Sequence, residues 1–351
     1  MSSEHIELVR RVLSEKAAAA GRKIRLMEVC GSHSFAIARA GIRNLLPENV
    51  KLLSGPGCPV CVSGENFISK VILLARAGVR VAVFGDLLRI PSPLGTPGAE
   101  KGLMVIYSPE EVLSYARAHK DESVVFAAVG FEPTQAAAAA MLDEAAEDGL
   151  DNFSILCDFK NIRPVLDRLC TDSESPLDGF LLPGHVAAVT GVDWFRGLAV
   201  PGVISGFAPE NILTSLAMLL ELAAAKRREV VNNYPSSVTA EGSTGARELI
   251  RKYFEPADGE WRGLGVIPGG NRALRQKYSR FDAMNRFEVL KQPLPSAPDR
   301  GCRCGEVLTG RLAPEECPLY DKICTPEHPV GACMVSVEGA CAASWYNRGR
   351  C

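Results

Sequence analysis

Short apolar runs alternate with stretches of helical periodicity through the first 290 residues of the chain. Strands that are buried on both faces of a parallel sheet have nearly continuous apolar sequences, whereas half-exposed strands alternate apolar and polar residues. The continuous type dominates here. The pattern therefore predicts parallel strands at 24–29, 50–55, 79–85, 103–108, 123–130, 153–159, 178–184 and 201–206.

Helical segments separate most of these runs, and an amphipathic helix is expected at the N-terminus. The segments with helical periodicity are 65–77, 109–119, 134–147, 164–170 and 211–227. Strands that alternate with helices are typical of α/β proteins, in which crossover helices cover a parallel sheet. The sequence therefore predicts the α/β class.

A short motif occurs twice in the same structural context. Gly130-Phe131-Glu132-Pro133 follows a strand and opens a helix, and the tetrapeptide GFAP does the same at 206–209. Chance could produce so short a repeat, but two similar α/β units that face a cleft would also explain it. We expect the first unit at 20–140, the second at 141–228, and a third region at 229–351 together with the N-terminal helix 1–19.

The overall composition changes this picture little. Of the 351 residues, 47% are hydrophobic and 23% are charged, as in ordinary globular proteins. With 39 basic against 41 acidic residues the net charge is −2, which argues against a nucleic-acid or anionic-membrane surface. No apolar run is long enough to cross a membrane, and the N-terminal segment is not typical of a signal peptide, so we expect a cytoplasmic protein.

Cysteine is the unusual residue: the chain has 12, against five histidines. Seven cysteines lie in the last fifty residues, which are rich in turn residues and would need a metal centre to hold them together. Four thiolates suit an iron–sulfur cluster or a structural zinc, and the lack of closely spaced pairs favours [4Fe–4S]. The candidate ligands, with twelve, six and sixteen residues between them, are Cys304, Cys317, Cys324 and Cys341, and the competing thiols are Cys302, Cys333 and Cys351.

Two further cysteine motifs lie between a strand and a helix. Cys58 and Cys61 form a Cys-x-x-Cys pair in GPGCPVC (55–61), where the start of a helix should favour thiolates and permit thiol–disulfide or metal chemistry. Cys30 and His33 in CGSHS (30–34) could form a nucleophile pair or a soft metal site, although a buried thiol is an equally good interpretation.

Glu132 and His185 are weaker candidates, placed where α/β sheets bind ligands. Each is more often structural. No phosphate-binding loop is present and the dinucleotide fingerprint is incomplete, so we expect no nucleotide.

Together the motifs resemble the HypD family of hydrogenase maturation proteins along nearly the whole chain. The segments that carry the resemblance are MEVCGSHS (27–34), GPGCPVCV (55–62), GDLLRIP (85–91), VIYSP (105–109), VGFEPT (129–134), PGHV (183–186), GFAPENIL (206–213), CRCGEVL (302–308) and EGACAA (338–343). The spacing of the four C-terminal cysteines is specific to the family.

The resemblance implies a scaffold that assembles the Fe(CN)2CO unit of [NiFe]-hydrogenases. The implied partners are a small HypC-like protein and a HypE-like donor that delivers cyanide as a thiocyanate on a C-terminal cysteine. Cys30 is the implied iron-binding thiol, and Cys304, Cys317, Cys324 and Cys341 are the implied [4Fe–4S] ligands. The cluster and the Cys58–Cys61 pair would supply and relay electrons, so the protein would be a redox-active scaffold and not a conventional turnover enzyme.

The chain departs from the family pattern at a few polar positions. Phe35 stands where the first motif usually has a second histidine, Pro133 replaces a threonine and Ala208 replaces a glutamate, and the segment 157–164 lacks a common histidine. These departures leave open a divergent member with an altered partner or cargo. Two other hypotheses are a stand-alone thiol–disulfide or electron-transfer protein and a zinc-stabilised adaptor.

Overall fold

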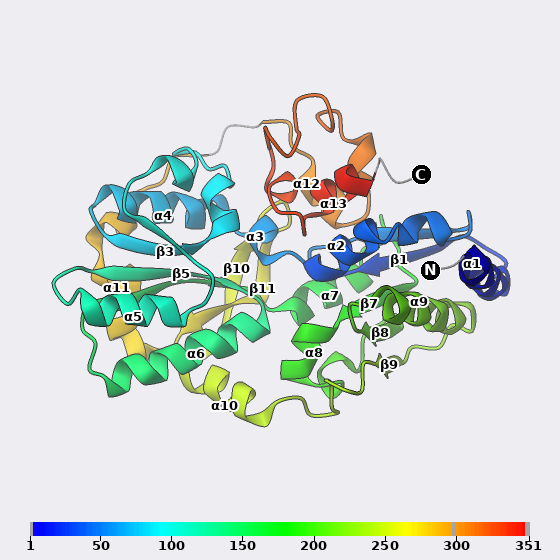
Figure 1. Ribbon diagram of the computed structural model, residues 1–351, viewed down its shortest axis with the longest axis horizontal. Coiled ribbons are helices and arrows are strands. Elements are labelled where there is room, and N and C mark those ends of the chain that lie inside the picture. The colour runs from blue at the N-terminus through cyan, green and yellow to red at the C-terminus, as the bar shows by residue number, and fades with distance from the viewer. Residues whose placement is uncertain (1–2, 297–299, 348–351) are drawn as a thin grey trace.

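The computed structural model describes residues 3–296 and 300–347 and consists of two parallel sheets, a β-hairpin between them and a C-terminal region that lies across both (Figure 1). The first sheet has the order β2-β1-β7-β8-β9 and the second has the order β4-β3-β5-β6. The strands are β1 (Ile24–Glu28), β2 (Val50–Ser54), β3 (Arg80–Phe84), β4 (Leu103–Ile106), β5 (Val124–Gly130), β6 (Phe153–Phe159), β7 (Gly179–Pro183), β8 (Gly202–Ser205) and β9 (Val230–Asn233). The antiparallel hairpin is β10 (Phe254–Trp261) with β11 (Gly265–Leu274).

Helices cover the faces of both sheets. The α-helices are α1 (Ser3–Ala18), α2 (Gly31–Arg39), α3 (Pro59–Val62), α4 (Glu65–Arg76), α5 (Glu110–Ala118), α6 (Glu132–Glu147), α7 (Ile162–Cys170), α8 (Gly184–Thr190), α9 (Pro209–Ala224), α10 (Thr244–Tyr253), α11 (Ala283–Arg286), α12 (Cys304–Leu308) and α13 (Ala340–Asn347). The 3-10 turns are η1 (Ile42–Leu45), η2 (Gly85–Arg89), η3 (Pro97–Ala99), η4 (Asp193–Phe195), η5 (Gln276–Phe281), η6 (Glu288–Lys291), η7 (Pro314–Glu316) and η8 (Ala332–Met334).

The predicted α/β class and all the predicted strands are confirmed, and the strands pair in parallel. The repeated motif also has the expected context, because one copy joins β5 to α6 and the other joins β8 to α9. Strands β9, β10 and β11 were not predicted. The hairpin sequences FEPADGEW and GVIPGGNRAL contain proline and glycine and have no apolar run, so local pattern gives no strand signal there.

The division between the sheets does not follow the predicted boundary at residue 140. Strand β1 pairs with β2 on one side and with β7, more than a hundred residues later, on the other, and neither β1 nor β2 pairs with β3. The chain leaves the first sheet after β2, builds the whole second sheet, and returns at β7. The apolar pattern predicts β1 to β8, but it carries no information about which strands become neighbours.

The C-terminal region lies on top of the first sheet and reaches the second. Helix α13 packs on α2, and η8 packs on α3. Arg89 of η2 donates a hydrogen bond to the Pro326 carbonyl, which ties this region to the end of β3. Within the part of the chain that the structure describes, no helix is both long and apolar enough to cross a bilayer.

A buried ion pair joins the second sheet to the hairpin. Lys160, which follows β6 and is fully buried, donates to Asp158 at 2.7 Å, to the Glu260 carbonyl at 2.7 Å and to Asn271 at 3.3 Å. Burial raises the pKa of Asp158, and the neighbouring ammonium group opposes that rise. The Lys160 ammonium and the Asp158 carboxylate therefore compensate each other, and removing either one leaves the other as a buried charge without a counter-ion.

We predict that Lys160→Met destabilises the protein by about 3–5 kcal/mol, because it leaves Asp158 buried without its cation. The double variant Lys160→Met/Asp158→Asn should recover part of this loss. Urea denaturation followed by circular dichroism measures both, with the exposed Lys120→Met as control. Equal stability of Lys160→Met and Lys120→Met would show that the buried pair does not hold the hairpin.

Candidate functional site

A cavity of about 210 Å³ lies where the carboxyl ends of strands from both sheets meet. Ligands of open α/β sheets bind at such ends, because the loops that follow the strands converge there. The lining residues lie at or after the ends of β1, β2, β5, β6 and β7 or come from the C-terminal region, and they include Cys30, Gly57, Pro59, Phe131, Pro133, Thr134, Ile162, Pro183, His185 and Glu338. The predicted cleft between two α/β units is therefore present.

Cys30 is the N-cap residue of α2 and is 8% exposed. Burial raises the pKa of its thiol to about 12, although the backbone N–H groups of His33 and Ser32 favour the thiolate. Although Cys30 lies at the start of a helix, desolvation outweighs the helix dipole and favours the protonated thiol. A bound metal cation would replace the proton and reverse this preference.

Glu338 is the polar group that the sequence did not single out. Its carboxylate accepts a hydrogen bond from Ser32 at 2.8 Å, and a Cβ on Gly31 would lie only 2.6 Å from Glu338 Oε2. Burial raises the pKa of this carboxyl. Glu338 lies 306 residues from Ser32 along the chain, so no local spacing could have connected it to Cys30.

The two predicted histidines both contact the ring of Phe207. His33 is fully buried, its Nε2 pairs with the Gly206 carbonyl at 3.0 Å, and burial lowers its pKa to about 4. His185 stacks on Phe207 at 4.0 Å and lines the cavity, and burial lowers its pKa as well. The low pKa keeps the His33 imidazole neutral at neutral pH. Of the two, only His185 reaches the cavity surface.

Glu132 is buried, but it is not among the residues that line the cavity. Its Oε1 accepts a hydrogen bond from the Ile162 backbone at 3.3 Å, and burial raises its pKa to about 7. The structure therefore places Glu132 directly behind the cavity wall, where it connects the start of α6 to the lining residue Ile162 at the start of α7.

Cys58 and Cys61 form a disulfide across the single turn of α3. Their exposed fractions are 4% and 0%, so the sulfurs are closed off from solvent. The loop that precedes them lies against the start of α2 next to Cys30, because the Gly31 N–H donates to the Gly57 carbonyl at 2.9 Å. The predicted position of the pair at the start of a helix is confirmed.

Six C-terminal cysteines line a closed, apolar cavity of about 20 Å³: Cys302, Cys304, Cys317, Cys324, Cys333 and Cys341. Cys333 lies on η8, which packs against α3, so this cavity adjoins the disulfide helix. Cys351, the other competing thiol, lies outside the described residues. Within 3–296 and 300–347, no three His, Cys, Asp or Glu side chains converge closely enough to hold a single metal ion.

The donor set of this cavity fits an iron–sulfur cluster. Burial, and then the neighbouring thiols, raises the pKa of Cys333 and Cys341 well above the ordinary value. Gathered thiolates in an apolar cavity repel one another, and a metal core would neutralise them. The Val330 N–H, at 3.4 Å from Cys324 Sγ, is the kind of backbone donor that stabilises a cluster ligand.

Comparison with known proteins agrees with these features. The HypD family model, described as the hydrogenase formation hypA family, matches residues 5–348. A hydrogenase maturation factor HypD of Azotobacter vinelandii is 39% identical over 345 residues, which cover 94% of this chain and 90% of that protein. HypD of Escherichia coli K12 is 38% identical over 97% of this chain and 93% of its own length. A putative hydrogenase expression/formation protein of Methanocaldococcus jannaschii is 37% identical over 91% and 90%.

The match to the family covers almost the whole chain, and the curated relatives share more than a third of its residues over nine-tenths of their own length. This confirms the resemblance seen in the sequence motifs. The chain belongs to the HypD family of hydrogenase maturation proteins.

Proposed function

We propose that the protein is a scaffold that holds the Fe(CN)2CO unit at Cys30 during [NiFe]-hydrogenase maturation, together with a HypC-like partner. A HypE-like donor would deliver cyanide as a thiocyanate. The observation that carries the proposal is the cleft itself, which presents one buried thiol to a small cavity beside His185 and Glu338. A soft, low-spin iron prefers such a thiolate to oxygen ligands.

The polar groups around Cys30 suit a small anionic cargo. Glu338 has a raised pKa and can donate a hydrogen bond when it is protonated, and His185 has a lowered pKa and stays neutral. Neither group adds a fixed positive charge that would trap cyanide in the cavity. Both can therefore orient the cargo by hydrogen bonds and release it again.

The Cys58–Cys61 pair is placed to serve as a two-electron store. Release of cyanide from a thiocyanate takes two electrons and a proton and leaves a thiol, and oxidation of a dithiol to a disulfide yields two electrons and two protons. Cys304, Cys317, Cys324 and Cys341 would hold a [4Fe–4S] cluster, which supplies electrons singly when bound. Burial of the disulfide favours electron delivery inside the protein over stand-alone exchange with other proteins.

The proposal requires the disulfide loop to lie against Cys30, and Gly57 makes this contact. A Cβ on Gly57 would lie 2.1 Å from the Cys30 backbone nitrogen. The nitrogen belongs to the backbone and a Cβ is bonded directly to the backbone, so no side-chain rotation can relieve such a clash.

We predict that Cys30→Ser keeps the fold and the brown colour of an iron–sulfur protein but loses the cyanide and carbonyl infrared bands. The measurement is the infrared spectrum of protein co-expressed with its HypC-like partner. His33→Ala should weaken the bands less, because the thiolate ligand remains. Cys170→Ser, at the end of α7 outside the cleft, is the matched control. Unchanged bands in Cys30→Ser would remove the basis of the iron-site assignment.

We predict that Cys317→Ala or Cys324→Ala loses iron and also destabilises the C-terminal region, because metal-binding free energy is folding free energy in a loop-rich segment. Cys333→Ala should retain the cluster. Iron content and thermal melting measure the two effects separately. A Cys324→Ala protein with full iron content and an unchanged melting curve would falsify the ligand assignment.

We predict that Gly57→Ala costs about 1–3 kcal/mol and weakens the infrared bands, since the loop must move away from Cys30. Gly245→Ala in α10 is the matched control, because a Cβ there meets no atom within 4 Å. That change should be neutral or should stabilise by up to about 1 kcal/mol. Similar denaturation midpoints for the two variants would mean that the loop is not held against Cys30.

A further inference from the structure

The turn that connects β10 to β11 lies between the two groups of cysteines. We call its residues, 262–264, the β10–β11 turn. On one side the turn contacts the end of α3, the helix that carries the disulfide. On the other side it contacts α12, which begins at Cys304 in the C-terminal cysteine cavity. One short segment therefore touches both groups.

Arg262 provides hydrogen-bond donors for the end of α3. Its backbone N–H donates to the Val62 carbonyl at 2.8 Å, and its Nε donates to the Ser63 carbonyl at 3.0 Å. The last carbonyl groups of a helix have no partner within the helix, so their donors come from other segments. Ser63 also forms a β-bridge with Trp261. The end of α3 is thus attached to the hairpin by both backbone and side-chain contacts.

The remaining nitrogens of the Arg262 guanidinium bind two further segments. Nη1 pairs with Glu65 at the start of α4 at 2.9 Å, and Nη2 donates to the Pro91 carbonyl after η2 at 3.1 Å. Arg262 is only 8% exposed. A planar guanidinium can make these contacts together, whereas the single ammonium group of a lysine cannot. Arg262 therefore fixes α3 relative to α4 and to the loop after η2.

The next residue of the turn lies against the cysteine cavity. Gly263 has a φ of +75°, and a Cβ there would lie 2.7 Å from the Gly305 nitrogen and 3.0 Å from Cys304 Sγ. The backbones of the turn and of α12 are therefore in direct contact. Burial raises the pKa of the Cys333 thiol in the same cavity, and the positive charge of Arg262 opposes that rise. The guanidinium is thus within electrostatic range of the cavity as well as bound to α3.

Helix α3 is too short to maintain its own geometry. It has four residues, Pro59–Val62, and a single helical turn is unstable by itself in water. While the disulfide is closed, the covalent bond keeps the two sulfurs together. Once the pair is reduced, noncovalent contacts have to maintain the turn, and those of Arg262 act at its C-terminal end. Thiols that are held close together close more readily, because less conformational freedom is lost.

From these contacts we propose that Arg262 is a positioning residue for the Cys58–Cys61 pair. It keeps the two thiols one helical turn apart in the reduced protein, which favours closure and makes the dithiol a stronger reductant. Closure releases two electrons and two protons, and reduction of the disulfide takes up the same number. The inference rests on the proposed role of the pair as a two-electron store, and it adds the residue that sets the strength of that store.

The test measures the thiol–disulfide equilibrium of the pair in full-length protein purified without oxygen. The protein is equilibrated with mixtures of reduced and oxidised glutathione or dithiothreitol, in which two reagent thiols reduce one protein disulfide. Reactions start from oxidised and from reduced protein and continue until both give the same ratio. After acid quenching, unfolding and alkylation, trypsin releases the peptide 52–70, whose only cysteines are Cys58 and Cys61. Mass spectrometry of this peptide gives the ratio of dithiol to disulfide.

We expect Arg262→Gln to shift the ratio about tenfold toward the dithiol, which corresponds to about 30 mV for a two-electron couple. Arg262→Lys should shift it to a similar extent, because lysine keeps the charge but not the planar set of donors. Glu65→Gln removes one partner of the guanidinium and should cause a smaller shift in the same direction. The matched control is the exposed Arg168→Gln, because Arg168 of α7 donates to the Leu264 carbonyl of the same turn at 2.8 Å. It should leave the ratio unchanged.

Several results would overturn the inference. They are a wild-type ratio in Arg262→Gln, an equal shift in Arg168→Gln, and full recovery by Arg262→Lys, which would show that charge and not position is responsible. Melting curves show whether Arg262→Gln folds, and if it does not, an unchanged ratio in Glu65→Gln contradicts the inference. A wild-type pair that stays oxidised in every mixture would contradict the electron store as well. A pair that cycles normally in all variants contradicts only the role of Arg262.

Discussion

The close approach of two backbones at Gly57 and Cys30 is the contact on which the site depends. Only a residue without a Cβ allows the loop after β2 to lie on the start of α2, where its carbonyl accepts the Gly31 N–H. This contact brings the disulfide of α3 beside the thiol that caps α2. Because η8 packs on α3, it also connects the C-terminal cysteine cavity to the cleft through one short helix.

Burial controls the electrostatics of this arrangement. Desolvation raises the pKa values of Cys30 and Glu338 and lowers those of His33 and His185, so each shift is toward the neutral form. Neutral groups cost little to bury, whereas isolated charges would have to be compensated. Under the proposed function, a metal cation that entered the cleft would take the place of the thiol proton of Cys30.

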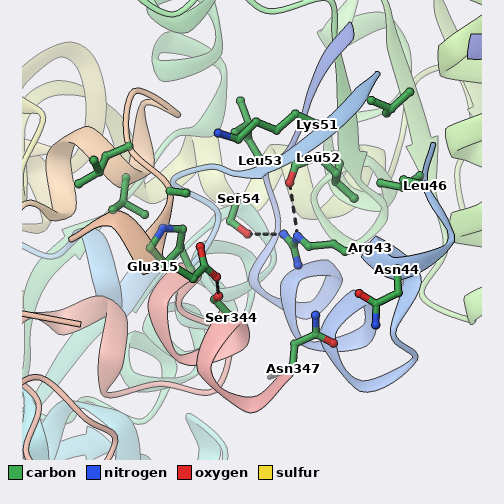
Figure 2. Close-up of a pocket in the computed structure, with 16 residues that line it drawn as sticks. Arg43, Asn44, Leu46, Lys51, Leu52, Leu53, Ser54, Glu315, Ser344 and Asn347 are labelled. Carbon is green, nitrogen blue, oxygen red and sulfur yellow. Dashed lines mark hydrogen bonds between the residues drawn. The ribbon is translucent and has the colours of Figure 1, made fainter. Parts of the chain in front are cut away.

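The C-terminal region takes part in two surfaces of the protein. One side faces the cleft and contributes Glu338 to its lining. On the other side, the segment between Cys304 and Cys317 forms, together with α13, one wall of a groove whose other wall is β2 (Figure 2). This region has few regular elements and a small apolar cluster of its own around Tyr320, Met334 and Ala342. Both surfaces lie close to α2. At the cleft, Ser32 of α2 donates to Glu338, and at the groove, Arg43 of η1, which follows α2, donates to Ser54.

The sequence alone determined the class of fold, the position of each core strand and the three cysteine motifs, because apolar runs, helical periodicity and residue spacing are local signals. Family motifs correctly indicated the membership that the comparisons confirmed. The tertiary structure alone decided that β1 joins β7, that Glu338 reaches Ser32, that the Glu132 side chain lies behind the cavity wall and that Cys30 is buried enough to keep its proton. Strand neighbours, long-range contacts and desolvation depend on how distant segments pack, and no local pattern encodes that packing.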